Sequence, residues 1–287
     1  IAMPRRILDA THLRWLSLVL CLLAVLGNAN AAVRGLPFSR TYSLEDIGYV
    51  PRGSRLNFDA FGRIAVIHDG VYAVLNDTAW QNLVDAEESA RTPMAAVVHR
   101  GYGRSYYSGR FSWGMAEFGP DGKLHAKPLV PPNAPAWTRV TTFDGIIVTV
   151  DGVYFTSRNG FVYWDFARKE CDLIEVPRTT EMFALGNRVY VSANAQPLRY
   201  FSPKERTLNV CPNPALDRTV IDRATSLDER RALISSTDGR MFVFDGQDMT
   251  PWEGQANPEL QGRISVLRSL SDGNVAMAGG SYLGFAQ

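Results

Sequence analysis

The sequence predicts an all-β fold, a β-propeller made of blades with four short antiparallel strands each. The first observation is a weak repeat of about 40 residues, the period typical of a propeller blade. The second is that each copy ends in an apolar and aromatic run followed by a turn residue. The third is that hairpin signals, and not helical periodicity, dominate the chain after its N-terminus.

The repeat is marked by five turn residues that follow the apolar runs. They lie 45, 44, 37 and 43 positions apart and are Asn76, Asp121, Asp165, Ser202 and Asp245. A sixth copy begins at 270–280. The spacing predicts five blades and part of a sixth over residues 55–287, with the five turns at equivalent blade positions. Because an incomplete ring exposes sheet edges, we expect further blades downstream.

Runs of β-branched and aromatic residues predict the individual strands. Residues 63–67, 71–75 and 189–192 are such runs, and they suit strands buried on both faces between neighbouring blades. Dipeptides that favour hairpins separate the runs: Asp69-Gly70, Asp151-Gly152, Asn159-Gly160 and Asp238-Gly239. We expect the last two to be two-residue turns with positive φ at the glycine. The best helix candidate is 78–90, for which a connecting loop is an equally good interpretation.

The N-terminal segment predicts export from the cytoplasm. Three arginines accompany 12 mostly apolar residues at 15–26, and an Ala-x-Ala pattern at 29–31 then fits a cleavage site. The apolar run is short for a membrane-spanning helix, which needs about 20 residues. We therefore predict a signal peptide at 3–31, with an uncleaved anchor as the alternative, and a lead-in segment at 32–54.

The charge balance argues against nucleic-acid binding. With 30 Lys and Arg against 29 Asp and Glu, the chain has no electrostatic footprint for nucleic acid, so no nucleic-acid partner is expected.

Two cysteines, Cys171 and Cys211, follow the predicted signal peptide. They are about one repeat apart, which places them near the outer ends of adjacent blades. A disulfide needs Cα atoms within about 7 Å, so we favour two separate thiols.

The sequence contains no recognisable catalytic or metal-binding pattern. His68, His99 and His125 follow no ligand spacing typical of a metal site. No serine lies in a Gly-x-Ser-x-Gly elbow. We therefore predict no catalytic residues, no metal and no cofactor, although a propeller enzyme would draw its acids from scattered blades.

One stretch combines aromatic rings with arginine in the most irregular copy of the repeat. Aromatic faces and a guanidinium bind sugars through flat apolar contact and directed hydrogen bonds. The candidate ligand residues are Tyr102, Arg104, Tyr106, Tyr107 and Trp113, with Phe111 between them. The alternative interpretation is inter-blade core, which the preference of aromatic residues for strands favours.

Short motifs give the chain a resemblance to a known family. The lead-in 40–48, the pattern Asp59-x-x-Gly62-x-Ile64 and the hairpin at 69–72 resemble the periplasmic sensors of the two-component regulator propeller family. The resemblance covers 40–287, with Ala65 where the family commonly has Trp. It implies a large extracytoplasmic propeller. It transfers no ligand residues, because the family motif is structural.

The resemblance implies a sensor and not an enzyme. The expected ligand is an oligosaccharide, and the expected location is the periplasm. An immunoglobulin-like strut, a membrane helix and a kinase, cyclase or transcription regulator would follow downstream and attach the protein to the membrane. A homodimer of the complete protein is left open. Two other classes remain: a secreted propeller enzyme acting on polysaccharide, and a propeller scaffold for protein–protein interaction.

Overall fold

The computed structural model describes residues 55–58, 63–68, 71–76, 79–84, 86–100, 104–213, 219–253, 264–270, 274–279 and 283–286. All of them belong to one unit of the chain, Asp46–Gln287. The predicted signal peptide at 3–31 and the lead-in at 32–54 lie outside the described residues. Among the described residues, no helix is long and apolar enough to cross a membrane.

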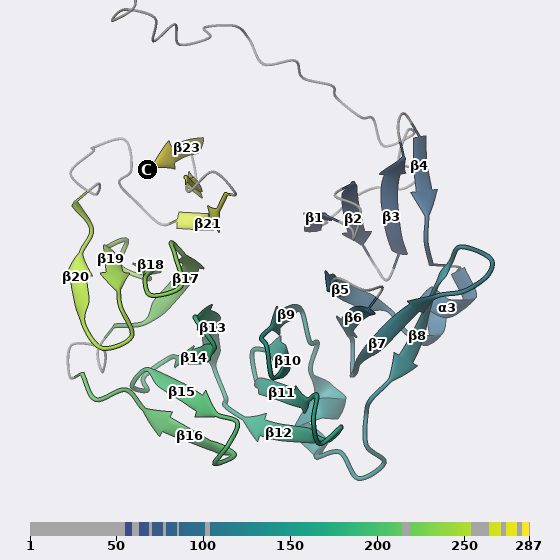
Figure 1. The fold of residues 1–287 in the computed structure, drawn as a ribbon, viewed down its shortest axis with the longest axis horizontal. Coiled ribbons are helices and arrows are strands. Elements are labelled where there is room, and N and C mark those ends of the chain that lie inside the picture. Colours follow the sequence, from purple (N-terminus) through teal and green to yellow (C-terminus); the bar gives the residue numbers. More distant parts are fainter. Residues whose placement is uncertain are drawn as a thin grey trace, which may run out of the picture. The chain divides into compact units, whose positions relative to one another are not determined.

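The described residues form six antiparallel sheets in series, five with four strands and one with three (Figure 1). The first three sheets contain β1 (Arg55–Phe58), β2 (Ile64–His68), β3 (Val71–Asn76) and β4 (Ala79–Asn82); β5 (Met94–Arg100), β6 (Arg104–Gly109), β7 (Ser112–Phe118) and β8 (Leu124–Pro128); and β9 (Gly145–Val148), β10 (Gly152–Ser157), β11 (Gly160–Asp165) and β12 (Cys171–Glu175). The other three contain β13 (Thr179–Leu185), β14 (Arg188–Ala193), β15 (Arg199–Ser202) and β16 (Thr207–Val210); β17 (Ile221–Ser226), β18 (Ala232–Ser236), β19 (Met241–Phe244) and β20 (Met249–Pro251); and β21 (Ile264–Ser269), β22 (Val275–Gly279) and β23 (Leu283–Ala286). The predicted fold class is confirmed, with five blades and part of a sixth.

Each sheet packs on the next one along the chain. Most of these contacts join first strands, as in the pairs β5 with β9, β13 with β17, and β17 with β21, whereas the first sheet contacts β5 through its second strand, β2. Five buried apolar clusters fill the spaces between successive sheets, and each takes side chains from two of them. The series stays open between the sheet that starts at β1 and the sheet that ends at β23 (Figure 1).

The five predicted turn residues do occupy equivalent positions. Asn76, Asp165 and Ser202 end the third strands of their sheets, and Asp121 and Asp245 follow the third strands of theirs. Aspartate suits this position because its carboxylate can accept the N–H groups of the turn. The Oδ1 atom of Asp165, for example, accepts the N–H groups of both Ala167 and Arg168, at 2.9 and 2.8 Å.

The two hairpins at 159–160 and 238–239 differ from the prediction. Ser157 pairs with Gly160, so the two-residue turn is Arg158 and Asn159, and Gly160 is the first residue of β11. Gly239 lies in a longer loop between β18 and β19, where its N–H donates to Ser236 O at 2.9 Å. Both glycines have positive φ, 139° and 84°, as expected. The prediction was wrong about the position of the first turn, because Gly160 closes that hairpin by pairing with Ser157. It was wrong about the length of the second, because Gly239 lies within a longer loop that Ser236 and Arg240 close.

The helix candidate at 78–90 divides into a strand and a short helix. Trp80 lies in β4, which completes the first sheet by pairing with β3. The helix α3 (Ala86–Arg91) then leads to the next sheet. Cross-strand pairing therefore decides the first half of this segment, where the local sequence was ambiguous.

Cys171 and Cys211 are free, as favoured. Cys171 begins β12, the fourth strand of its sheet, and Cys211 directly follows β16, the fourth strand of the next. Burial raises the pKa of Cys211 to about 11, which keeps this thiol protonated at neutral pH.

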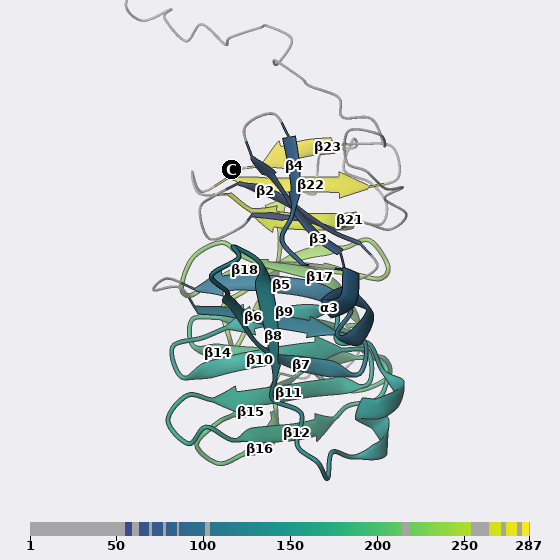
Figure 2. The same cartoon turned by 90° about the vertical axis from the view of Figure 1, so that its right-hand side faces the viewer.

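The meander order gives each blade two different rims. One rim, which we call the hairpin face, carries the turns from first to second strand and from third to fourth strand. The opposite rim, the connection face, has the turns from second to third strand and the chain between sheets. Two helical segments among the described residues, α3 and the 3-10 helix η1 (Ala136–Val140), belong to such connections and lie on the same side of the molecule in Figure 2.

A half-buried carboxyl group lies between first strands of successive sheets. Glu181 of β13 has one oxygen 3.8 Å from Nη1 of Arg223 on β17, and its side chain is 22% exposed. Burial raises the pKa of Glu181 to about 7, although Arg223 and Arg268 favour the charged form and Asp222 opposes it. The carboxylate is therefore less stable here than in water.

Replacing Glu181 with glutamine is expected to remove a pH-dependent loss of stability. Because the pKa of Glu181 is about 7 in the folded protein and 4.5 ordinarily, the native protein binds more protons between these values. Its stability therefore falls as pH rises through this window. Relative to Glu181→Gln, the wild type should lose on the order of 1–3 kcal/mol between pH 5 and pH 8. Urea denaturation at both pH values measures the difference, and a constant offset between the two proteins would contradict the assignment.

Candidate functional site

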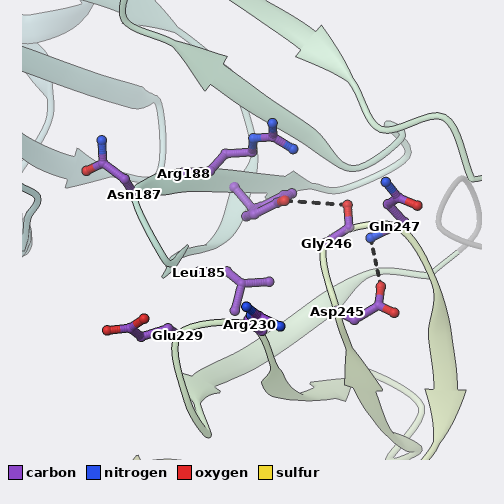
Figure 3. Close-up of a pocket in the computed structure, with 9 residues that line it drawn as sticks. Leu185, Asn187, Arg188, Glu229, Arg230, Asp245, Gly246 and Gln247 are labelled. Carbon is purple, nitrogen blue, oxygen red and sulfur yellow. Dashed lines mark hydrogen bonds between the residues drawn. The ribbon is translucent and has the colours of Figure 1, made fainter.

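A pocket of about 710 Å³ opens on the hairpin face between the sheets β13–β16 and β17–β20 (Figure 3). Three turns border it, those joining β13 to β14, β17 to β18 and β19 to β20. Its lining residues are Leu185, Asn187, Arg188, Tyr190, Glu229, Arg230, Asp245, Gly246 and Gln247. The pocket therefore takes its walls from two neighbouring blades.

The turn from β13 to β14 is tight and is tied to the preceding sheet. Leu185 pairs with Arg188, which leaves Gly186 and Asn187 as a two-residue turn. Gly186 has φ of 57°, as the first position of a type II′ hairpin turn requires. Asn187 Nδ2 donates to a carboxylate oxygen of Asp151 at 2.5 Å, so this amide is held in place by the turn between β9 and β10.

The turn from β19 to β20 is organised by Asp245. Its Oδ1 accepts the N–H groups of Asp248 and Gln247, at 2.7 and 2.9 Å. These hydrogen bonds hold the pKa of Asp245 below its ordinary value, so the pocket keeps this carboxylate charged in mildly acidic solution. Gly246 has φ of 98°, and its carbonyl oxygen lies 3.5 Å from the Tyr190 hydroxyl.

The turn from β17 to β18 presents two charged side chains at its tip. Asp228 holds the turn by accepting the N–H groups of Arg230 and Arg231, both at 2.7 Å, and it also pairs with the Arg231 guanidinium. Among the described residues, the side chains of Glu229 and Arg230 have no hydrogen-bond or ion-pair partner. Both remain available to a ligand.

Arg188 is the second cation of the pocket. Its guanidinium stacks 4.4 Å from the centre of the Tyr200 ring. A hydrogen bond to Tyr190 raises the pKa of Arg188 above its ordinary value. The ring and the hydroxyl together orient this side chain and preserve its charge.

The pocket offers a balanced set of polar groups. Arg188, Arg230 and Gln247 can donate hydrogen bonds, while Glu229 and Asp245 can accept them. With two cations and two carboxylates, its formal charge is near zero. Such a set suits a neutral ligand with many groups that both donate and accept.

Two of the candidate histidines, His99 and His125, have local partners. His99 lies 2.8 Å from the Tyr72 hydroxyl and 2.6 Å from Ser105 Oγ. His125 lies 3.2 Å from the carboxylate of Asp121. Across the described ranges, no three His, Cys, Asp or Glu side chains come together in a way that could hold a metal ion.

Three of the aromatic candidates from the sequence lie in the core and not in this pocket. Tyr106, Tyr107 and Trp113 are 2%, 0% and 0% exposed. Successive side chains of β6 point to opposite faces of the sheet, so Tyr106 and Tyr107 enter the clusters on its two sides. Assigning these three to a surface site was wrong, and the core interpretation is correct. Arg104 is exposed at the start of β6, and Tyr102 lies outside the described residues.

Sequence reasoning missed the pocket residues. The turn signals at Gly186-Asn187 and Asp245-Gly246 were readable, because both pairs favour tight turns. The three turns around the pocket come together because two blades pack against each other, since these turns belong to two sheets. No local signal in the sequence indicates that they face one pocket.

Neither a family model nor a curated protein matches the chain. Solved structures do. The extracellular domain of a hybrid two-component system from B. thetaiotaomicron superposes with a TM-score of 0.58 at 14% identity, over 83% of this chain and 34% of that one. A second such domain from B. thetaiotaomicron gives 0.56 at 13%, over 82% and 31%. The WD40 β-propeller domain of Doa1 gives 0.51 at 10%, over 75% and 71%.

The chain is a β-propeller. At these identities, the likeness is one of fold. The chain spans about a third of the length of the two B. thetaiotaomicron domains. The pocket of this propeller lies where two blades meet, a location at which a ligand contacts both.

Proposed function

We propose that this propeller is the extracytoplasmic ligand-sensing domain of a membrane-bound signalling protein and that its hairpin-face pocket binds an oligosaccharide. The observation that carries the proposal is the mixed set of donors and acceptors held on rigid turns of two blades. The predicted signal peptide and the shared fold with extracellular domains of two-component systems support the location. Binding without turnover is the expected chemistry.

The chemistry of the pocket matches that of sugar hydroxyls. A hydroxyl donates one hydrogen bond and accepts others, so it can join a guanidinium on one side and a carboxylate on the other. Arg230 and Glu229 stand next to each other on one turn and provide both kinds of group. The volume of about 710 Å³ falls within the range of small-molecule sites.

A pocket shared by two blades also suits a sensor. A ligand shifts a conformational equilibrium only if it binds the two states unequally. Because Arg188 and Arg230 belong to different sheets, a ligand that contacts both is sensitive to how these sheets are placed. We propose that a bound ligand changes how these two sheets are placed and that this change signals ligand binding to the rest of the protein.

The test is calorimetric titration of the protein with a panel of neutral and acidic oligosaccharides. Arg230→Ala should weaken binding about tenfold, the effect of losing one charge-assisted hydrogen bond, with an unchanged melting temperature. The matched control is Arg231→Ala. Arg231 neighbours Arg230 in the same turn but pairs with Asp228 and does not line the pocket, so its loss should leave affinity unchanged.

Three outcomes would contradict the proposal in different ways. If no saccharide binds, the ligand class is wrong. If Arg230→Ala binds like the wild type, the pocket is wrong. If chromatography shows cleaved saccharide after incubation, the propeller is an enzyme. The scaffold alternative predicts no stabilisation by any saccharide in a thermal melt.

A further inference from the structure

Four exposed arginines lie on the connection face over three consecutive sheets. We call them the arginine row: Arg110 in the turn from β6 to β7, Arg139 in η1, Arg158 in the turn from β10 to β11, and Arg178 between β12 and β13. The pocket described above opens on the opposite rim. A ligand of the pocket and a partner on this row would therefore not compete for space.

Backbone hydrogen bonds connect the segments that carry the arginine row. The N–H of Phe111 donates to Thr141 O at 3.1 Å, joining the β6–β7 turn to the segment after η1. The N–H of Thr179 donates to Arg158 O, and that of Asn194 donates to Arg178 O, both at 3.0 Å. The four arginines are thus mounted on adjoining, hydrogen-bonded segments and not on independent loops.

The charge of the arginine row is not neutralised within the described part of the chain. None of the four guanidinium groups forms an ion pair with a described residue, and only Arg139 has a hydrogen bond, at 3.5 Å to Pro132 O. Two other arginines of the same face differ, because Arg240 pairs with Asp238 and Arg91 pairs with Glu87.

Two carboxylates accompany the row. Asp144 precedes β9, and Glu175 ends β12. The local balance of four arginines against two acids leaves this part of the connection face positive. It therefore complements a negatively charged partner.

Exposed apolar side chains adjoin one end of the arginine row. Phe111 is 41% exposed and Val140 is 73% exposed. The Arg110 guanidinium lies 4.8 Å from the centre of the Phe111 ring. Phe111 has φ of 62°, a conformation in which a bulky residue is unusual and glycine would be less strained. An aromatic side chain is thus held at the surface in a turn that does not favour it.

We propose that the arginine row, with Phe111 and Val140, binds an acidic segment of a partner protein that also carries apolar side chains. Arginine and aromatic residues are enriched in protein interfaces, and lysine is depleted. Guanidinium groups bind carboxylates in two-pronged pairs, which favours Asp and Glu side chains as their targets. The exposed phenylalanine and valine require apolar contacts that a purely ionic polymer would not supply.

The test uses a fluorescent synthetic peptide in which Glu and Asp alternate with Leu and Phe, titrated with the protein and followed by anisotropy. The double variant Arg158→Glu/Arg178→Glu should weaken binding by about tenfold or more. The control is Arg240→Glu, on the same face but paired with Asp238, which should change affinity by less than about twofold. Circular dichroism checks that each variant is folded.

A second variant separates apolar contact from charge. Phe111→Ala should weaken binding of the Leu and Phe peptide but not of a peptide with the same acids and serine in place of Leu and Phe. Equal losses for Arg240→Glu and the double variant would overturn the proposal, as would no binding of the peptide. Preferential binding of heparin or of phosphatidylglycerol vesicles would overturn it in favour of a polysaccharide or a membrane.

Discussion

Replacing Trp113 with alanine is expected to destabilise the protein by about 3–5 kcal/mol, the usual loss for a buried tryptophan. Trp113 is fully buried, and its ring centre lies 4.8 Å from that of Phe143. The cluster around it takes residues from β6, β7, β10 and β11 and joins two consecutive sheets. Because the two sheets could close the resulting cavity only by shifting toward each other, which the rest of the cluster resists, the loss should lie in the upper part of this range.

Chemical denaturation of wild type and Trp113→Ala measures this loss. The matched control is Phe111→Ala, two positions earlier, where the ring is 41% exposed and its removal should change the free energy of unfolding by less than about 1 kcal/mol. Saccharide affinity of folded Trp113→Ala should be unchanged, because the pocket lies between other sheets. A small loss of stability with a large loss of affinity would return Trp113 to the binding surface.

Gly160→Val should have the second large effect, on the order of 4 kcal/mol, because two penalties add. The first is strain, since φ at Gly160 is 139°, a region that side chains rarely adopt. The second is overlap. A Cβ atom at this position would lie 2.1 Å from Ile174 O and 2.8 Å from Val176 N, which are backbone atoms of β12 and of the residue that follows it. Neither can move without breaking the pairing of β11 with β12.

Gly122→Val separates the two penalties. Gly122 also has positive φ, 74°, but a Cβ atom there would meet nothing within 4 Å. Its replacement should destabilise by only about 1–2 kcal/mol, from strain alone. Urea midpoints of the two variants give the comparison. Equal losses for the two would mean that close approach of the backbone contributes nothing at Gly160.

The two proposed sites lie on opposite rims of the propeller. Turns from first to second and from third to fourth strand build the pocket on the hairpin face for which we propose a saccharide ligand. Second-to-third turns and connections build the arginine row on the other. Every strand of a blade ends at one of these rims, so the core can remain constant while both rims vary.

The amino-acid sequence alone was enough to predict the repeat, the strand content and the kind of residue at each third-to-fourth turn. These are local properties. Asp165 and Asp245 were recognisable because an aspartate side chain satisfies backbone N–H groups two and three residues ahead, whatever surrounds it. Runs such as 189–192 were recognisable because strands buried on both faces need continuous apolar residues.

Which side chains are buried and which come together could be seen only after the blades were packed against one another. From the sequence, Tyr106 and Trp113 were candidates for a sugar-binding surface with core as the favoured alternative, and the sheet that packs beside them makes them core. Arg188 and Arg230 are 42 positions apart and share a pocket because two blades adjoin. The physical reason is that burial and convergence depend on contacts between blades, which no short stretch of sequence encodes, whereas turns and strands depend on neighbours along the chain.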